Sequence, residues 1–485
     1  MLPTRKIPPL RTPYEIVPNQ LSNRKLLEID RRTKDRSARI FPNRVRVDQR
    51  GRLINPTQFI IAGIGRDIDQ FTEGRELWLQ APKGGIGQQS ERKKVKVIKS
   101  RKCCPDGKRY VLLEALESSL DSLEGQETII YESSTSPNGI GVIHPGGSNP
   151  GGKDHSGQVN TYGVNLLVRA RNEDTTPSLA EIRDIRKVAT YERDAVRKRL
   201  NVAVLDSGIL FTNPLPADAP TDCINSQFVG WDFVHDSPFP VDDHKGLHGT
   251  KISTIIKHYA PDAGIIPVKI SNTNGSLTLY DALCGLEYAR CQGATIINAS
   301  WSFTGASEAV AGNETDFPLL WKAVKSLTDA GVIVVAAAGN KNQYDHPDGH
   351  ITTPRIYPAC YSDKQDKLFT ITTVRHQPAD PSAGIRKPKY IAFENYSPDF
   401  VDTGVLADAD SKETPGRFSI PGFLGSYQGS SFATPIVVAK MVNALLAGTS
   451  YSVTKEELLE KLDGFTAKEA DLAYAIREKS CYINV

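Results

Sequence analysis

Residues 201–209 read NVAVLDSGI, an apolar run that ends in an acidic residue and a turn. The run is nearly continuous in apolar side chains, as a β-strand covered on both faces requires, and Ser207-Gly208 then turns the chain away. Similar runs recur down the chain, separated by helical segments such as residues 279–292 (LYDALCGLEYARCQ). They are residues 264–270 (GIIPVKI), 294–300 (ATIINAS), 331–339 (GVIVVAAAG) and 369–374 (FTITTV). This alternation predicts an α/β domain with a mainly parallel sheet flanked by helices.

The residues upstream of this domain carry a second, β-rich pattern. Short apolar runs recur, and residues 103–108 (CCPDGK) combine the preset φ of proline with the positive φ of glycine that a tight turn needs. The runs are residues 58–64 (QFIIAGI), 76–80 (ELWLQ), 94–99 (KVKVIK), 109–116 (RYVLLEAL) and 127–131 (ETIIY). We therefore predict a β-rich accessory domain over residues 51–132, with a hairpin between the third and fourth runs.

Two segments lack the composition of a packed domain. Residues 133–160 are rich in glycine and proline and predict a linker, which places the α/β domain at residues 161–485. Residues 1–50 hold 13 Lys and Arg against 5 Asp and Glu and predict an extended basic arm. A basic arm of this kind is typical of segments that bind nucleic acid or an acidic protein surface. Because it lacks interleaved aromatic residues, nucleic-acid binding is not favoured. Nearer the first α/β strand, Ser178 and Glu181 stand at capping-box spacing and predict a helix that reaches about residue 200.

Length and composition exclude several classes of protein. The 485 residues exceed the ~250 to 300 at which one core stops growing, so at least two domains are expected. No run approaches the ~18 apolar residues of a membrane span, and the first 30 residues lack an apolar signal segment, so we expect a cytoplasmic protein without membrane contact. The seven cysteines are odd in number and scattered, which predicts reduced thiols. Residues 147–153 (GSNPGGK) have P-loop spacing, but Asp154 replaces the serine or threonine that would bind magnesium.

Four polar residues stand where parallel strands end or helices begin, which is where α/β proteins build their sites. Asp206 ends the first strand, and His248 opens a predicted helix within GLHGTKIS. Ser431 lies in GSSFATP before a long apolar helix, and Asn340 follows the strand GVIVVAAAG. Each alone is more often a turn former, a helix cap or a structural side chain. Together they predict one site, because a purely structural origin for all four is improbable.

Pro435 fixes where the last helix starts. Proline lacks an N–H and clashes with the carbonyl four residues back, so the helix must begin around Ser431. A serine there has its Oγ at the positive end of the helix dipole, beside unpaired backbone N–H groups that could receive an oxyanion. The side-chain amide of Asn340 could donate to the same oxyanion.

The domain from about residue 200 to residue 448 resembles the subtilases, the subtilisin-like serine proteases of peptidase family S8. Its VLDSGI, LHGTKIS, VVAAAGN and GSSFATP stretches resemble the family's Asp, His, oxyanion-Asn and Ser blocks, in the chain order Asp, His, Ser. The resemblance implies a subtilisin-like fold and a serine endopeptidase. In it Ser431 attacks the peptide carbonyl, His248 takes the proton, and Asp206 holds the imidazole in its tautomer. Asn340 and the Ser431 N–H would stabilise the oxyanion.

The same resemblance implies where the substrate lies. Ser300, Trp301 and Ser302 would form an edge that pairs with the substrate backbone, and four small residues would wall the S1 pocket. Those four are Ala336, Ala337, Ala338 and Gly339. The chain departs from the family where Lys251 and Ile252 follow the HGT block, and where Trp301 and Ser302 replace the usual residues. No familiar calcium-loop pattern is present, so we expect no required cofactor and no metal at the site.

We therefore predict an intracellular serine endopeptidase that cleaves protein or peptide substrates through an acyl-enzyme intermediate. Because a cytoplasmic protease must be restrained, residues 1–175 are expected to restrain, target or assemble the catalytic domain, through a regulatory partner or directly. The alternative interpretation of residues 1–175 is a prosegment that is removed by cleavage. The alternative function is a non-catalytic, protease-like binding or signalling module that contacts a partner or nucleic acid through the basic arm.

Overall fold

The computed structural model describes most of the chain from residue 46 onward. The described residues are 46–47, 53–64, 66–80, 92–115, 120, 129–133, 140–143, 159–168, 181–192, 200–212, 223, 229–305, 317–341, 349–352, 355–377, 388–448, 454–477 and 480–485. Most of the predicted basic arm and the glycine-rich motif at residues 147–153 lie outside these ranges. Among the described residues, none of the helices has both the length and the apolar character needed to span a bilayer.

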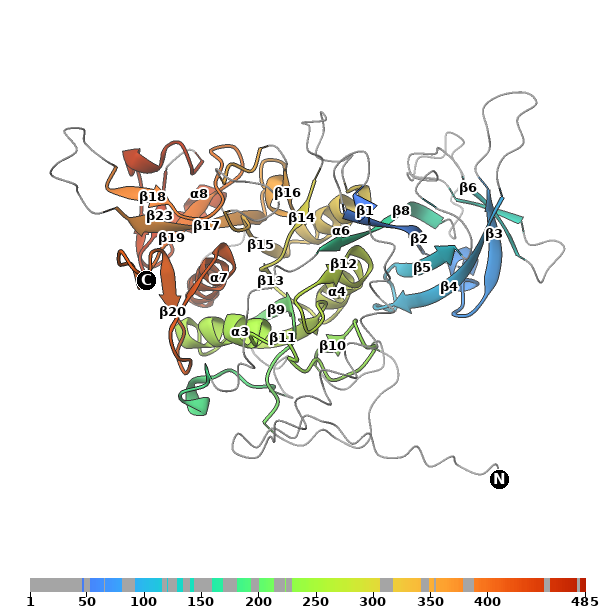
Figure 1. Ribbon diagram of the computed structural model, residues 1–485, viewed down its shortest axis with the longest axis horizontal. Coiled ribbons are helices and arrows are strands. Elements are labelled where there is room, and N and C mark those ends of the chain that lie inside the picture. Colours follow the sequence, from blue (N-terminus) through green and yellow to red (C-terminus); the bar gives the residue numbers. More distant parts are fainter. Residues whose placement is uncertain are drawn as a thin grey trace.

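The predicted parallel sheet is confirmed (Figure 1). Its strands follow the order β10-β11-β9-β13-β15-β17-β19-β23-β22, and every neighbouring pair from β10 to β23 is parallel. The bounds are β9 (Asn201–Asp206), β10 (Trp231–Asp232), β11 (Gly264–Lys269), β13 (Ile296–Ala299), β15 (Ile333–Ala337), β17 (Leu368–His376), β19 (Thr403–Leu406), β22 (Phe465–Thr466) and β23 (Tyr482–Ile483). Strand β18 (Tyr390–Ala392) adds antiparallel to β17. Each of the five apolar runs quoted at the outset thus forms a strand of this sheet.

Helices cover both faces of the sheet, which explains why its central strands are mostly apolar on both faces. In β9, Val202 and Val204 belong to one buried cluster with residues of α3 (His248–Tyr259) and α7 (Ser430–Leu446). The alternating Ala203 and Leu205 belong to a second cluster with α4 (Leu279–Cys291) and α6 (Pro318–Asp329). Because successive side chains of a strand point to opposite faces, a sheet between two helical layers must be apolar throughout.

Short elements complete this domain. They are β14 (Phe303–Thr304), β16 (Ile356–Tyr357), β20 (Arg417–Ser419), β21 (Ser426–Gln428), α8 (Lys455–Glu460) and the 3₁₀ turns η3 (Ile185–Lys187), η5 (Ala359–Tyr361) and η6 (Ala470–Leu472). The helix predicted to run up to residue 200 is wrong over residues 181–192, where residue 181 and the η3 turn are 3₁₀ and no residue is α-helical. Backbone pairing of this segment with residues 422–424 replaces the helix, so tertiary contacts override the local capping signal.

A second, antiparallel sheet forms the predicted β-rich accessory domain, with the order β12-β8-β2-β5-β4-β3-β6-β7 and β1 beside β2. The bounds are β1 (Arg46–Val47), β2 (Leu53–Gly63), β3 (Glu76–Gln80), β4 (Arg92–Lys102), β5 (Arg109–Ala115), β6 (Ile129–Ser133), β7 (Ile140–Ile143), β8 (Val159–Val168) and β12 (Leu277–Thr278), with the short helix α2 (Arg66–Asp69) after β2. The β4–β5 hairpin is confirmed. The range predicted as a linker contains β7, and β8 extends the accessory sheet to residue 168, beyond the predicted boundary at residue 160.

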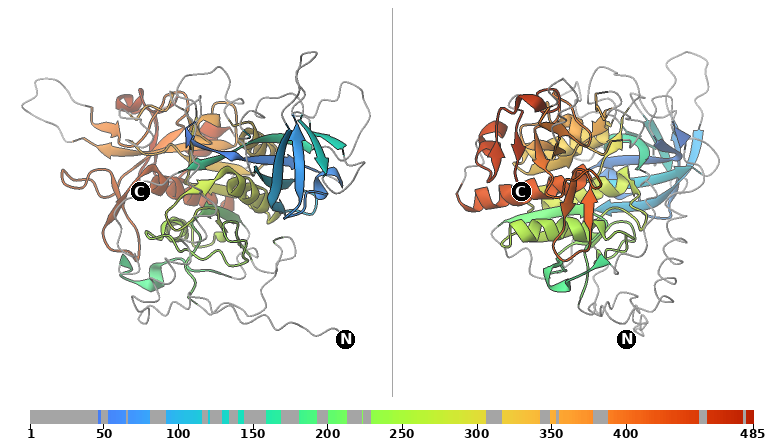
Figure 2. Two further views of the ribbon diagram at one scale, coloured as in Figure 1. Left: turned by 45° about the vertical axis from the view of Figure 1, so that its right-hand side comes forward. Right: turned by 60° about the vertical axis from the view of Figure 1, so that its left-hand side comes forward.

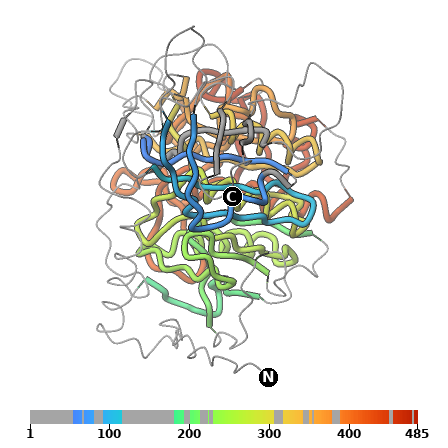
Figure 3. Tube along the Cα trace, turned by 90° about the vertical axis from the view of Figure 1, so that its right-hand side faces the viewer, coloured from blue at the N-terminus to red at the C-terminus, as the bar shows by residue number. Residues whose placement is uncertain are grey.

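The two sheets are joined directly. Strand β12 precedes α4 in the α/β domain and pairs antiparallel with β8, where Leu277 lies opposite Val168. The accessory strands lie against α4 and α6, on the side of the molecule away from the C-terminus (Figures 1 and 2), and cross in front of them in Figure 3. Lys99 of β4 donates to the Phe233 carbonyl at 3.0 Å and to Asp281 Oδ1 at 3.1 Å. The buried cores of the two parts form one cluster.

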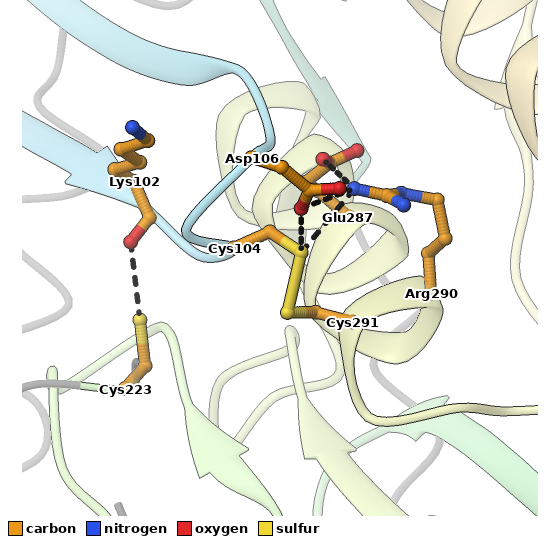
Figure 4. The surroundings of a disulfide bond; sticks show 7 residues. All are labelled: Lys102, Cys104, Asp106, Cys223, Glu287, Arg290 and Cys291. Atoms are coloured by element: carbon orange, nitrogen blue, oxygen red, sulfur yellow. Dashed lines mark hydrogen bonds and ion pairs between the residues drawn. A yellow bond between two sulfur atoms is a disulfide. The ribbon is translucent and has the colours of Figure 1, made fainter. Parts of the chain in front are cut away.

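A disulfide adds a covalent link between the two parts (Figure 4). It joins Cys104, in the β4–β5 turn, to Cys291, the last residue of α4. Arg290 lies beside it, with Nη2 3.0 Å from Glu287 Oε1 and 3.2 Å from Cys104 Sγ. The prediction of reduced thiols is therefore wrong for this pair. The other five cysteines are buried and form no disulfide: Cys103, Cys223, Cys284, Cys360 and Cys481.

Replacing Cys104 by serine is expected to lower the free energy of unfolding by about 2–4 kcal/mol, because the bond closes a long loop in the unfolded chain. Urea unfolding followed by circular dichroism measures this change. A dithiol reductant should destabilise the wild-type protein by a similar amount and leave the Cys104→Ser variant unchanged. Equal sensitivity of both proteins to the reductant would contradict the assignment.

Candidate active site

Asp206 and His248 form a hydrogen-bonded pair at the carboxyl end of the parallel sheet. Asp206 is the last residue of β9, and its side chain is 5% exposed. His248 is the first residue of α3, and its Nδ1 lies 2.8 Å from Asp206 Oδ1 and 2.9 Å from Oδ2. The backbone N–H of Ser207 donates to Oδ1 at 2.7 Å and holds the carboxylate in place. The contact fixes Nδ1 as the protonated nitrogen of a neutral imidazole, which leaves Nε2 as the base.

The electrostatics of the pair favour a charged imidazole. Burial by itself lowers the pKa of His248, but the charge of Asp206 and its hydrogen bond outweigh burial, and the pKa lies above the ordinary histidine value. A second imidazole, His244, lies with its ring centroid 6.2 Å from that of His248. Burial lowers the pKa of His244 to about 4. Of the two imidazoles, His248 is therefore the one that takes up a proton more readily.

Asp242 organises this pair and was missed in the sequence. Its side chain is buried; Oδ1 accepts from the Ser207 hydroxyl at 2.8 Å, and Oδ2 accepts from Thr250 N at 2.8 Å and Thr250 Oγ1 at 2.6 Å. The Ser207 hydroxyl in turn accepts from Gly249 N at 2.9 Å. One carboxylate thus joins the turn after β9 to the first turn of α3. A signal was present: α3 starts after Leu247, which provides no side-chain cap, so its N–H groups needed an acceptor from elsewhere.

Ser431 and Asn340 meet at the start of α7. Asn340 Oδ1 accepts from Ser430 N at 2.9 Å and from Ser430 Oγ at 3.1 Å, which fixes the orientation of the amide. Gly429 lies between them with φ +135°, and a Cβ built there would lie 3.2 Å from both Asn340 Nδ2 and Ser431 Oγ. A side chain at this position would fill the space between the amide donor and the hydroxyl, so glycine keeps that space open.

Pro435 has a second consequence at this site. Helix α7 begins at Ser430, one residue from the predicted start, and Pro435 lies in its second turn. Because proline has no N–H, the carbonyl of Ser431, four residues earlier, lacks its partner within the helix. Ser300 supplies one: its hydroxyl donates to Ser431 O at 3.0 Å. The turn that carries Ser431 is therefore attached to the end of β13.

The histidine and serine helices pack side by side with their N-termini together. The ring of Phe432, which directly follows Ser431, lies 5.3 Å from the imidazole of His248, centroid to centroid. Both His248 and Ser431 are partly exposed, whereas Asp206 and Ser430 are buried. The structure thus shows a carboxylate–imidazole pair at the start of α3 and a hydroxyl with an amide at the start of α7, and the Phe432 ring lies between the two helices.

The predicted substrate-binding residues have mostly buried side chains, and two of them, Ser300 and Gly339, contact residues 431 and 430. Trp301 and Ser302 are buried, and Trp301 packs edge-on against Phe303 at 5.8 Å between ring centroids. Only the backbone of this stretch is thus suited to pair with a substrate. The four small residues predicted to wall a pocket, at the end of β15, are also buried; they are Ala336, Ala337, Ala338 and Gly339. Among the described residues, no group of three or more His, Cys, Asp or Glu side chains is arranged to hold a metal ion.

A hydroxyl at a helix N-terminus, an imidazole held by a carboxylate and an amide donor on one parallel sheet are the components of a serine hydrolase site. The subtilase family matches residues 197–464, more than half of the chain, and the chain belongs to that family. It is 32% identical over 170 residues to thermitase of Thermoactinomyces vulgaris, covering 33% of this chain and 52% of thermitase. It is 30% identical over 195 residues to the major intracellular serine protease of Bacillus subtilis (strain 168), covering 38% and 54%. The chain thus spans about half the length of each.

A third relative matches a longer stretch. Serine protease AprX of Bacillus subtilis (strain 168) is 26% identical over 355 residues, covering 61% of this chain and 74% of AprX. The relatives differ in location, since the minor extracellular protease Epr of the same organism is 32% identical over 174 residues, covering 34% of this chain and 22% of Epr.

Proposed function

We propose that this protein is a serine endopeptidase in which Ser431 is the nucleophile, His248 the general base and Asp206 the residue that orients the imidazole. The observation that carries the proposal is the hydrogen bond of both Asp206 oxygens to His248 Nδ1, next to a serine at the N-terminus of α7. Protein or peptide chains are the proposed substrates, in keeping with the family.

The chemistry follows from the positions of these groups. His248 Nε2 takes the proton of Ser431, whose oxygen attacks the peptide carbonyl, and Asp206 stabilises the resulting imidazolium. Asn340 Nδ2 and the backbone N–H of Ser431 donate to the oxyanion, at the end of the helix where the dipole favours negative charge. The imidazolium then protonates the leaving amine, and water hydrolyses the acyl-enzyme by the reverse sequence of proton transfers.

A fluorophosphonate probe tests this proposal, because it modifies a serine only when that serine is an activated nucleophile. The full-length protein should digest labelled casein, and peptide mass analysis after labelling should find the modification on Ser431. Casein digestion without modification of Ser431, or modification at another serine, would contradict the assignment of the nucleophile. If the protein neither digests casein nor is labelled, the alternative of a non-catalytic module is favoured.

The accessory sheet is proposed to be a permanent part of the enzyme and not a prosegment that is removed. Three contacts support this: the β8–β12 pairing, the shared buried core and the Cys104–Cys291 bond. Mass analysis of active protein should therefore find residues 53–168 still covalently connected to the catalytic domain under non-reducing conditions. Active protein that lacks these residues would show that the region is a prosegment.

The compartment is proposed to be intracellular, by likeness to the intracellular relative of Bacillus subtilis. Five buried cysteines outside any disulfide are typical of a reducing compartment, whereas the Cys104–Cys291 bond is typical of an oxidising one. Alkylation of cells with a maleimide polymer, before and after reduction, would show whether this bond is formed where the protein resides. A reduced pair would support the intracellular assignment.

A further inference from the structure

Residues 181–192, which precede the strand β9, run alongside the elements that carry the active-site residues. We call them the upstream segment. Its backbone pairs with the loop that leads to Ser431: Leu424 N donates to Glu181 O at 2.7 Å, and Arg183 N donates to Gly422 O at 2.7 Å. Gly422 is required there, because its φ is +83° and a Cβ would lie 2.7 Å from the Asp184 carbonyl. The segment also contacts α3, where Ala189 N donates to Thr254 Oγ1 at 2.9 Å.

Three side chains join these elements at one point. Lys251 Nζ lies 2.7 Å from Glu181 Oε2 and 3.8 Å from the centre of the Tyr427 ring. The Tyr427 hydroxyl lies 3.0 Å from the same Glu181 oxygen. The Lys251 side chain is only 3% exposed, and burial lowers its pKa against the opposing pull of Glu181. A cation so enclosed needs its carboxylate partner, because an unpaired buried charge is costly.

This cluster lies directly behind the active site. Lys251 is three residues after His248 on α3, and Tyr427, on β21, is four residues before Ser431. The Tyr427 ring packs on Phe432 at 5.7 Å between centroids, and Phe432 packs on the imidazole of His248. The cluster of Glu181, Lys251 and Tyr427 therefore connects α3, which carries His248, to the loop that leads to Ser431.

We propose that Glu181, Lys251 and Tyr427 form a clamp that sets the position of His248 relative to Ser431, so that the upstream segment is a working part of the active site. They are positioning residues, since none of them touches the reacting atoms. This inference rests on the proposed function, because it assigns how the same nucleophile and base are held. The clamp also implies that any change that moves the Glu181 side chain away from Lys251 lowers the reactivity of Ser431.

The test is the rate constant for fluorophosphonate labelling of Ser431 in the full-length protein, wild type against Glu181→Gln. This change keeps the size of the side chain and removes its charge. Because small displacements between reacting groups cost large factors in rate, we expect labelling to slow by on the order of 10- to 100-fold. Circular dichroism melting confirms that the variant is folded.

The chain supplies a matched control. Glu192 and Lys257 join the same segment to the same helix at 3.5 Å, but six residues further along α3 and more exposed. Since exposed ion pairs contribute little, Glu192→Gln should label within about threefold of wild type. Equal rates for Glu181→Gln, Glu192→Gln and wild type would overturn the clamp while leaving the proposed function standing. A wild-type protein that does not label would instead overturn the proposed function itself.

The pH dependence of labelling separates positioning from general damage to the fold. The charged and titratable groups that act on His248 are Asp206 from β9, Asp242 and His244 from the loop before α3, and Lys251 on α3 itself; from α7, the uncharged Phe432 ring packs on the imidazole. The Lys251 cation disfavours the imidazolium. Lys251→Met should therefore move the acidic limb of the rate profile to higher pH, and Glu181→Gln should move it to lower pH. Slower labelling with no movement of either limb would contradict the clamp.

Two conservative variants keep the proposal falsifiable if Glu181→Gln is unfolded. Lys251→Arg retains the cation and can still bind Glu181, so it should label faster than Lys251→Met. Tyr427→Phe keeps the ring over Lys251 but removes the hydroxyl near Glu181, so it should label more slowly than wild type. If Arg and Met at residue 251 label equally and Tyr427→Phe matches wild type, the clamp is wrong.

Discussion

Replacing Ser431 by alanine is expected to lower kcat by about 10⁶-fold, the scale on which such a triad fails when its nucleophile is removed. The hydroxyl is the only part lost, and it lies at the start of α7 beside Asn340, where no other side chain of the four-residue site can form an acyl-enzyme. Steady-state hydrolysis of a peptide substrate measures the loss. A residual rate above that of water is expected, because the oxyanion donors remain.

The neighbouring serine is the matched control for that experiment. Ser430 is fully buried, and its hydroxyl donates to Gly339 O at 2.9 Å. Because Ser430 Oγ also contacts Asn340 Oδ1, Ser430→Ala is expected to weaken catalysis partially while Ser431 remains open to the fluorophosphonate. The reverse pattern, in which Ser430→Ala abolishes labelling and Ser431→Ala retains it, would show that the nucleophile has been misassigned by one residue.

Asp206→Asn is expected to lower kcat by about 10⁴-fold with little change in overall structure. Both carboxylate oxygens face His248 Nδ1 at 2.8 and 2.9 Å, so an amide at this position presents an N–H to the same nitrogen and favours the tautomer protonated on Nε2. That tautomer cannot accept the serine proton. The raised pKa of His248 should also fall, which moves the acidic limb of kcat/KM to lower pH.

A second aspartate–histidine pair provides the control for Asp206→Asn. Asp232 Oδ2 lies 2.7 Å from His235 Nδ1, in a buried position outside the four-residue site. Asp232→Asn removes the same charge from a similar pair, so it should reduce stability and leave kcat of the folded protein far closer to wild type. If both substitutions lower kcat equally, the loss reflects damage to the fold and not the role of Asp206.

Much of the fold could be predicted because its signals are local. The strand at residues 201–206 is apolar at its four central positions, since helices cover both of its faces, and the acidic residue that ends it lies at the carboxyl end of the sheet, where sites form. Pro435 likewise placed the start of α7 to within one residue. That Asp206 and His248 belong to one site could be predicted because each residue marks the end of a regular element, whereas their pairing was expected from the resemblance to the subtilases.

The features that were missed depend on contacts between distant segments. Cys104 and Cys291 are 187 residues apart, and only the packing of a hairpin turn on the end of α4 brings them together. Glu181 carried a capping signal, but Lys251 on α3 takes its carboxylate instead. Asp242 was overlooked because the acceptor for the first turn of α3 lies further back in the loop before the helix and not at the cap position, Leu247. In each case the tertiary partner outweighs the local preference.

The pairing of β8 with β12 bears on how the molecule can be divided. Without the accessory strands, the short strand β12 that leads into α4 would lose its partner β8, and apolar residues of α4 would face water. Unpaired edges and large apolar patches invite self-association. The α/β domain expressed without the accessory sheet would therefore be poorly soluble. Recombination between relatives would succeed more often when the accessory sheet and α4 came from the same parent.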